Sequence, residues 1–185
     1  MKVAQALGLL ILILVIVGCQ KQQENEAAAK LTDRDPQCAI VEISPFSYVC
    51  LPYHGNRNHH AAVEAFRTAA AEQGFELANT MLAIYELRPG QESDSITWEI
   101  GFVVPESLVV MEPLSVKKWN FTRVVQATHH GPMSQLDQIY PKIFKFVKHH
   151  HLTMVGPVVE RFPAIPTASD STELTTEIWV AIKNE

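Results

Sequence analysis

The chain has 185 residues, of which 47% are hydrophobic, and its formal net charge at pH 7 is -5. An acidic chain without a basic cluster is poorly suited to bind phosphate backbones, so we expect no nucleic acid partner. The sequence also contains no helix-turn-helix, no Walker loop, no dinucleotide-binding glycine signature and no G-x-S-x-G nucleophile motif.

The first residues predict export from the cytoplasm. Lys2 is followed by an apolar run, residues 9–17, that is too short to span a bilayer comfortably. The run ends at Gly18-Cys19, which resembles the lipobox of bacterial lipoproteins, with Ile16 where leucine is usual. The resemblance implies that residues 1–18 are a signal peptide and that Cys19 carries a lipid. An uncleaved N-terminal membrane helix is the alternative.

Residues 19–36 predict a flexible tether. Gln, Glu, Lys, Ala and Asp dominate this stretch, and such a composition buries too little apolar surface to offset the entropy of ordering. Gln20 follows the cysteine in place of aspartate, and resemblance to the sorting rules of Gram-negative lipoproteins then favours the outer membrane. We therefore expect a protein anchored by lipid on the periplasmic side of the cell envelope.

Residues 37–185 are the right size for one domain with a real core, and they contain an internal repeat. Each half predicts a strand, a His-Gly turn, an amphipathic helix and two further strands. In the first half these are His54-Gly55, a helix with Val63, Phe66 and Ala70, a strand over 81–87 and another around 97–100. In the second half they are His130-Gly131, a helix from Leu136 to Val147, a strand over 158–162 opened by a Gly156-Pro157 turn, and a strand over 175–182. The pattern predicts an α+β domain of two duplicated β-α-β-β units, with pseudo-twofold symmetry and a central ligand cleft.

The predicted strands carry four candidate ligand-binding carboxylates, Glu86, Glu99, Glu160 and Glu177. Ionised carboxylates are seldom buried unless a cation or another partner compensates them, so glutamates in apolar strands are good site candidates. The repeat predicts that all four approach one concavity from related positions. Half-exposed strand positions that face solvent are the alternative.

Four aromatic residues lie next to or near these glutamates: Tyr85, Trp98, Phe102 and Trp179. Aromatic rings supply stacking area and cation–π attraction, and a carboxylate supplies charge. Together they suit a flat or cationic apolar molecule. Aromatic residues in strands are also common core residues, and we expect at least half of these four to serve in that way.

The histidine pairs and the histidine run do not predict a metal site. Adjacent histidines, such as His59-His60 and His129-His130, point in different directions on a helix or a strand and do not readily present two ligands to one ion. The run His149–His151 suits a helix C-terminus, where a partly protonated imidazole interacts well with the helix dipole.

Two further cysteines, Cys38 and Cys50, leave two alternatives open. A disulfide is permitted in an oxidising compartment if the chain bends at Ser44-Pro45, since an extended segment would hold the two residues too far apart. Two buried thiols are the other possibility.

The second half carries the motifs HHGPMSQLDQIY, GPVVERF and TTEIWVAI. In combination with the repeat, they resemble the GyrI-like small-molecule-binding domain over residues 43 to 183. The resemblance implies that Glu160 and Glu177 line a drug pocket with Trp98 and Tyr85 as its nearest aromatic walls. Met133 departs from the tyrosine or phenylalanine that is common in the family at its position. The same fold serves as the effector-binding domain of multidrug-responsive transcription activators, but here the N-terminus serves export, so we expect no DNA-binding segment.

The leading hypothesis is a lipid-anchored envelope protein that binds a small hydrophobic or cationic molecule without a cofactor. A hydrolase is the first alternative, because relatives of the superfamily open strained cyclopropane rings and a pocket glutamate could act as a general base. A structural or interaction lipoprotein is the second. A haem-binding protein of the related fold is the third, although no histidine stands out as an axial ligand.

Overall fold

The computed structural model describes residues 38–55, 57–77, 80–86, 96–165 and 174–183. They belong to one compact unit, Pro36–Glu185. The predicted signal peptide (1–18) and tether (19–36), with Cys19, lie outside the described residues, so the expectations about them stay predictions. None of the described helices has the length and apolar character needed to cross a membrane.

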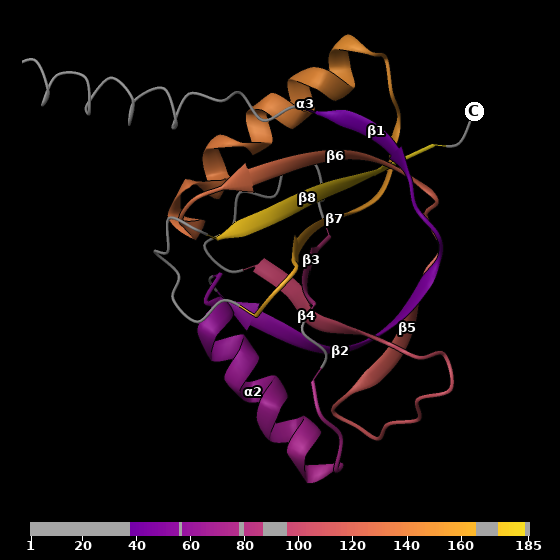
Figure 1. Cartoon of the computed structure of the whole chain (residues 1–185), viewed down its shortest axis with the longest axis vertical. Coiled ribbons are helices and arrows are strands. Elements are labelled where there is room, and N and C mark those ends of the chain that lie inside the picture. The colour runs from indigo at the N-terminus through magenta and orange to yellow at the C-terminus, as the bar shows by residue number, and fades with distance from the viewer. Residues whose placement is uncertain (1–37, 56, 78–79, 87–95, 166–173, 184–185) are drawn as a thin grey trace, which may run out of the picture. The chain divides into compact units, whose positions relative to one another are not determined.

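The described strands form one antiparallel sheet in the order β1-β6-β8-β7-β3-β4-β2-β5 (Figure 1). Their bounds are β1 Ala39–Glu42, β2 Phe46–Gly55, β3 Met81–Tyr85, β4 Ile96–Val104, β5 Ser115–Trp119, β6 Arg123–His130, β7 Met154–Phe162 and β8 Thr175–Ile182. The helices are α2 (His59–Glu72), the 3-10 helix η1 (Met133–Gln138) and α3 (Tyr140–His149).

The duplication predicted from the sequence is confirmed. One unit is β2-α2-β3-β4 and the other is β6-η1-α3-β7-β8. From the middle of the sheet outward, the first unit runs β3-β4-β2 and the second runs β7-β8-β6, so the units meet at the β3–β7 pair. The α+β class and the pseudo-twofold arrangement of the sheet follow from this order.

Both helices pack on the same face of the sheet, which we call the helix-covered face. Asn58 caps α2 by accepting a hydrogen bond from the Ala61 backbone N–H at 3.0 Å. The Phe66 ring of α2 then contacts the Phe102 ring of β4, with 4.7 Å between centroids. From α3, Ile143 and Val147 join the same apolar cluster. This shared core places the first turn of each helix over the middle of the sheet.

Side chains that alternate with these belong to a second apolar cluster on the opposite face of the sheet. It contains Leu82 of β3, Val159 of β7 and Trp179 of β8, together with Trp119 of β5. Successive side chains of a strand point to opposite faces of the sheet, so the cluster to which a strand residue belongs shows which face it occupies.

The structure corrects three expectations about local elements. Strand β3 ends at Tyr85, so the predicted strand over 81–87 is shorter and Glu86 follows it as an exposed residue, while Leu87 lies outside the described residues. Gly156 and Pro157 lie inside β7, where the pairing with β8 is irregular between Met154 and Val158, and they do not form a turn. The second helix is divided into η1 and α3, with a proline in the first turn of α3.

No disulfide joins Cys38 and Cys50. Cys50 is buried in β2, with its sulfur 3.4 Å from the Ser115 hydroxyl, and burial raises the pKa of its thiol to about 11. Cys38 packs against the apolar cluster of the helix-covered face, whereas Cys50 belongs to the cluster on the opposite face. The two cysteines are therefore assigned to different faces of the sheet.

We predict that Gly156→Ala destabilises the domain. A methyl group at Gly156 would lie 2.6 Å from the Phe121 ring, and such overpacking costs about 1–3 kcal/mol. Denaturant unfolding of the variant measures this cost. In the Phe121→Leu background the cost should shrink, and a cost that is the same in both backgrounds would contradict the packing described here.

Candidate functional site

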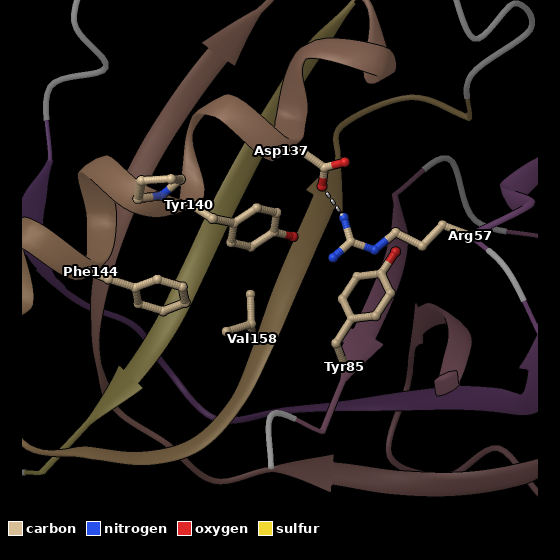
Figure 2. Close-up of a pocket in the computed structure, with 7 residues that line it drawn as sticks. Arg57, Tyr85, Asp137, Tyr140, Phe144 and Val158 are labelled. Atoms are coloured by element: carbon tan, nitrogen blue, oxygen red, sulfur yellow. Dashed lines mark hydrogen bonds and ion pairs between the residues drawn. The ribbon is translucent and has the colours of Figure 1, made fainter. Parts of the chain in front are cut away.

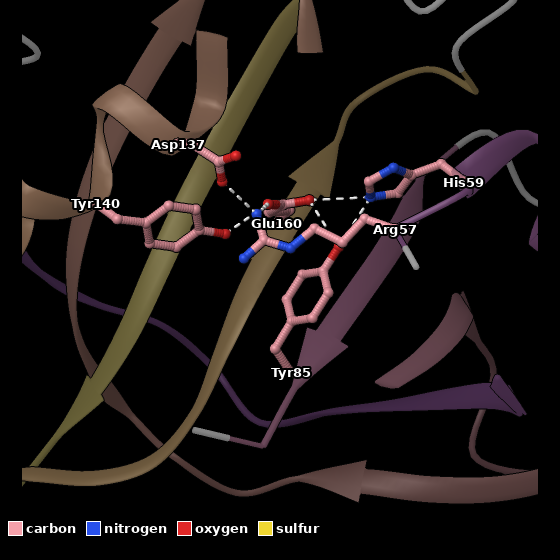
Figure 3. Close-up of polar contacts among 6 residues, drawn as sticks. All are labelled: Arg57, His59, Tyr85, Asp137, Tyr140 and Glu160. Carbon is pink, nitrogen blue, oxygen red and sulfur yellow. Dashed lines mark hydrogen bonds and ion pairs between the residues drawn. The ribbon is translucent and has the colours of Figure 1, made fainter. Parts of the chain in front are cut away.

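The helix-covered face buries one carboxylate completely, that of Glu160 in β7, which has 0% exposure. Oε2 accepts hydrogen bonds from the Tyr85 hydroxyl and from His59 Nε2, each at 3.0 Å (Figure 3). Oε1 accepts a hydrogen bond from the Tyr140 hydroxyl at 2.5 Å. Three donors from three elements therefore surround this one carboxylate.

These donors decide the charge of Glu160. Burial by itself would raise the pKa of its carboxyl, but the hydrogen bond and charge of His59, the hydrogen bond from Tyr140 and the charge of Arg57 hold it below the usual value of 4.5. Burial, reinforced by the Glu160 charge, raises the pKa of both tyrosines, so both phenols stay protonated and can donate. Glu160 is thus a buried anion at neutral pH.

The fold supplies the donors from the ends of elements. His59 is the first residue of α2, Tyr85 the last of β3 and Tyr140 the first of α3. The His59 ring is held between Trp98 and Phe162, at centroid distances of 5.2 and 5.6 Å. The site therefore depends on the packing of both helices against the central strands.

A cavity of about 280 Å³ adjoins this cluster. It is lined by Tyr85 of β3, Val158 of β7, Asp137 of η1, three residues of α3 and Arg57 just before α2; the α3 residues are Tyr140, Pro141 and Phe144 (Figure 2). Glu160 itself is not among the lining residues, whereas Arg57, Tyr85 and Tyr140 line the cavity and also contact Glu160. The carboxylate therefore lies behind the cavity wall.

Arg57 brings the one guanidinium into this wall. Its Nη1 donates to Asp137 Oδ1 at 2.6 Å and lies 3.9 Å from Glu160 Oε1. The guanidinium carbon is 5.0 Å from the centre of the Tyr85 ring and 5.3 Å from that of Tyr140, which are cation–π distances. Burial lowers the pKa of Arg57, but Tyr140, Glu160, Tyr85 and Asp137 outweigh it and the net shift is upward.

The cavity over the central strands and the sequence of the chain agree with one known family. The model of the GyrI-like small molecule binding domain matches residues 36–183. The chain belongs to the GyrI-like family. A small-molecule-binding domain therefore accounts for the cavity over the central strands.

Solved structures show the same fold at low identity. EcmrR, in a cryo-EM structure with DNA, matches with a TM-score of 0.69 at 15% identity over 97% of this chain and 70% of that one. The EcmrR C-terminal domain matches with a TM-score of 0.67 at 15% identity, over 81% of this chain and 99% of that one. A hydrolase from Listeria innocua matches with a TM-score of 0.57 at 10% identity, over 85% of this chain and 97% of that one. No curated protein gives a match.

Of the aromatic residues predicted for the GyrI-like site, Tyr85 lines the cavity, and Trp98 packs against the Tyr85 ring without lining the cavity itself. The Trp98 ring is buried and stacks on Tyr85 at 5.6 Å. Phe102 is a core residue packed against α2. Trp179 lies on the opposite face, where the Arg161 guanidinium is 5.5 Å from its ring.

The expectation that four glutamates converge on one concavity is wrong, and strand register is the reason. Glu160 stands opposite Ile178 in the β7–β8 pair, while Arg161 stands opposite Glu177. Directly opposed residues share a face, so Glu177 is on the opposite face from Glu160, and its carboxylate binds Arg161 at 3.0 Å.

The other two glutamates also lie away from the cavity. Glu99 stands opposite Ile84, a residue of the opposite face, and pairs with Lys117. Glu86 follows β3 as an exposed residue, and the residue of β3 that stands opposite Glu160 is Ala83. Of the four candidates, only Glu160 adjoins the cavity.

Four site residues were not predicted from the sequence: Arg57, His59, Asp137 and Tyr140. The sequence presents His59 as one of an adjacent histidine pair, and Tyr140 falls within the helix predicted from Leu136 to Val147. Among the described residues, no group of three or more His, Cys, Asp or Glu could hold a metal ion. The positions of Arg57 and His59 could have indicated the site. They lie at the start of the predicted first helix, where the chain turns back over the sheet and polar side chains can face the central strands.

We predict that ionised Glu160 stabilises the fold and that acid removes this contribution. Since its folded pKa lies below the usual value, the contribution is present above the unfolded pKa of about 4.3 and is lost as pH falls through the folded value. At about pH 5.5 the Glu160→Gln variant should be less stable by about 1–3 kcal/mol. The difference should narrow below about pH 4.

The measurement is urea unfolding of both proteins between about pH 3 and 5.5, a range below the ordinary histidine pKa of about 6.5. Glu177→Gln serves as the control, since it removes a partly exposed carboxylate, paired with Arg161, from the opposite face. A difference that widens as pH falls would mean that Glu160 is protonated in the folded protein.

Proposed function

We propose that this GyrI-like domain binds a small aromatic or hydrophobic cation in the cavity beside Glu160. The observation that carries the proposal is the buried anion behind an aromatic-lined wall. The Tyr85 and Tyr140 rings flank the guanidinium of Arg57 at cation–π distances, so the wall already accommodates an organic cation. Asp137 adds a second negative charge at the cavity.

The energetics favour a cation over a neutral molecule of the same shape. A cation over a desolvated aromatic face gains about 2 kcal/mol, and charge-assisted contacts contribute similar amounts. Glu160 is separated from the cavity by the tyrosines and Arg57, but its field acts in surroundings where screening by water is weak. Phe144 and Val158 supply the apolar surface that a hydrophobic cation requires.

Hydrolysis is the alternative, since a Listeria innocua protein of this fold is a hydrolase. A strained electrophile as the substrate is what the family resemblance of the sequence implies. A general base near neutral pH works best with a pKa near 7. The low pKa of Glu160 and its three donors make it a weak base, and this disfavours the catalytic hypothesis. A purely structural role is disfavoured by a cavity of about 280 Å³.

The proposal includes a lipid anchor at Cys19 that holds the domain on the periplasmic side of the envelope, preferably at the outer membrane. It rests on the lipobox resemblance of residues 1–19 and the polar composition of residues 20–36.

Benzamidinium and benzamide test the proposed charge selectivity, because they differ in charge but hardly in shape. We predict that Glu160→Gln weakens benzamidinium binding by about 1–2 kcal/mol and leaves benzamide binding nearly unchanged, as titration calorimetry would show. Glu177→Gln should have no such effect. Equal losses for the two probes would contradict cation recognition.

The catalytic alternative gives a different pattern in the same variant. If Glu160 activates water, Glu160→Gln should leave binding unchanged and abolish turnover of a cyclopropane-bearing electrophile, because an amide cannot take up the proton. Product formation by the wild type that is lost in the variant would replace the binding proposal with a hydrolase.

The anchor makes a separate prediction. Cys19→Ala should move the protein from the membrane fraction to the soluble fraction, because a single lipidated residue would be its attachment. Cys38→Ala is the matched control and should stay in the membrane. Membrane recovery of Cys19→Ala equal to that of the control would point to an uncleaved N-terminal helix.

A further inference from the structure

We propose that Arg57 is a built-in occupant of the cation site, and that ligands bind by displacing its guanidinium from between Tyr85 and Tyr140. The inference rests on the proposed function and adds the class of ligand: cations with planar, delocalised charge, such as amidinium and guanidinium groups on a small aromatic body.

The first support is the position of the guanidinium. It lies 5.0 and 5.3 Å from the two tyrosine ring centres and 3.9 Å from Glu160 Oε1 (Figure 3). This is the place that combines the ring faces with the field of the buried carboxylate. A ligand cation in the cavity cannot use the same ring faces while Arg57 covers them.

The second support is that Arg57 can leave without breaking the site. Glu160 takes its hydrogen bonds from Tyr85, His59 and Tyr140, and Arg57 is beyond hydrogen-bond distance of it. Departure of the guanidinium therefore leaves all three donors of the carboxylate in place. No buried hydrogen bond is lost in the exchange, provided that another cation takes its position.

The third support is the partner that Arg57 does bind. Its hydrogen bond goes to Asp137 at 2.6 Å, and the Asp137 side chain is 79% exposed while that of Arg57 is 37% exposed. Asp137 lies on η1 at the edge of the cavity (Figure 2). Arg57 can thus swing outward and keep its hydrogen bond, which makes the exchange a small movement of one side chain.

The shape of the vacated space sets the ligand class. A guanidinium is planar and stacks on aromatic faces, whereas a compact ammonium is a strongly hydrated point charge. An arylamidinium or arylguanidinium reproduces the stacked group, and its ring can extend over Phe144 and Val158. A compact ammonium reproduces only the charge.

The test compares benzamidinium, benzamide and benzoate on the full-length wild type and on Arg57→Gln. Without the internal competitor, Arg57→Gln should bind benzamidinium about tenfold more tightly or better, which corresponds to about 1.4 kcal/mol. Arg67→Gln is the matched control, because Arg67 on α2 pairs with Glu64 away from the cavity and its loss changes net charge equally. It should leave binding unchanged. Arg57→Lys should give an affinity between those of the wild type and Arg57→Gln.

A second readout follows Arg57 directly. In the wild type, the NMR signal of the Arg57 Nε–H group, assigned by its loss in Arg57→Gln, should move toward its solvent-exposed position when benzamidinium is added, as the ring currents of the two tyrosines are lost. Benzamide, which carries no charge to replace that of Arg57, should not produce this movement.

The outcomes separate the two proposals. If benzamidinium binds through Glu160 but Arg57→Gln binds it equally or more weakly, the displacement inference is wrong and the proposed function stands. If benzoate binds the wild type and fails to bind Arg57→Gln, Arg57 is a fixed anion-binding residue and the inference is again overturned. If Glu160→Gln has no effect on benzamidinium in either background, the proposed function fails and the inference falls with it.

Discussion

The structure of this site depends on the pairing of one buried charge. A carboxylate with no exposure would be strongly disfavoured in an apolar core without partners, and Glu160 is accommodated by two tyrosines and a histidine that donate to it. Each donor stands at the end of an element, so the need to satisfy Glu160 links β7 to β3, α2 and α3. Arg57 then completes the charge balance from the cavity side.

The duplicated fold positions this site but does not duplicate it. The two units meet at β3 and β7, where Ala83 stands opposite Glu160, so the middle of the helix-covered face carries one carboxylate and not two. Tyr85 of the first unit, backed by the buried Trp98 ring, lines one side of the cavity, and Tyr140 and Phe144 of the second unit line the other. The pseudo-twofold sheet therefore gives an asymmetric cavity, with lining residues from both units and the buried Glu160 carboxylate behind its wall.

Much of the fold was predictable because it follows from local patterns of apolar residues along the chain. The helix with Val63 and Phe66 and the apolar strands follow from spacing along the chain, and the structure has them. The two predicted His-Gly turns fall at the ends of β2 and β6, where Gly55 and Gly131 have positive φ. Glu160 stood out because a glutamate lies among valines in β7. The opposite placement of Glu177 was not predictable, because it depends on which residue of β7 faces which residue of β8, and a shift of one residue reverses the face.

The rest of the site was not predictable for a related reason. Arg57 and Glu160 are far apart in sequence, and their meeting depends on how α2 packs on the sheet. Tyr140 fits an apolar helix pattern just as well when its hydroxyl binds a carboxylate. The spacing of apolar residues indicates which face of a helix or strand a residue occupies. It does not indicate which polar atom of a neighbouring helix or strand that residue will contact.

The central claim is that Glu160 is held as an anion inside the core by its donors and by Arg57. The most direct measurement is the pKa of its side-chain carboxyl, followed by carbon-detected NMR of the selectively labelled protein and assigned with Glu160→Gln. The account predicts a value below the usual 4.5. A value raised toward neutrality would contradict it, because the carboxyl would then be neutral near physiological pH and could not provide the charge on which cation recognition depends.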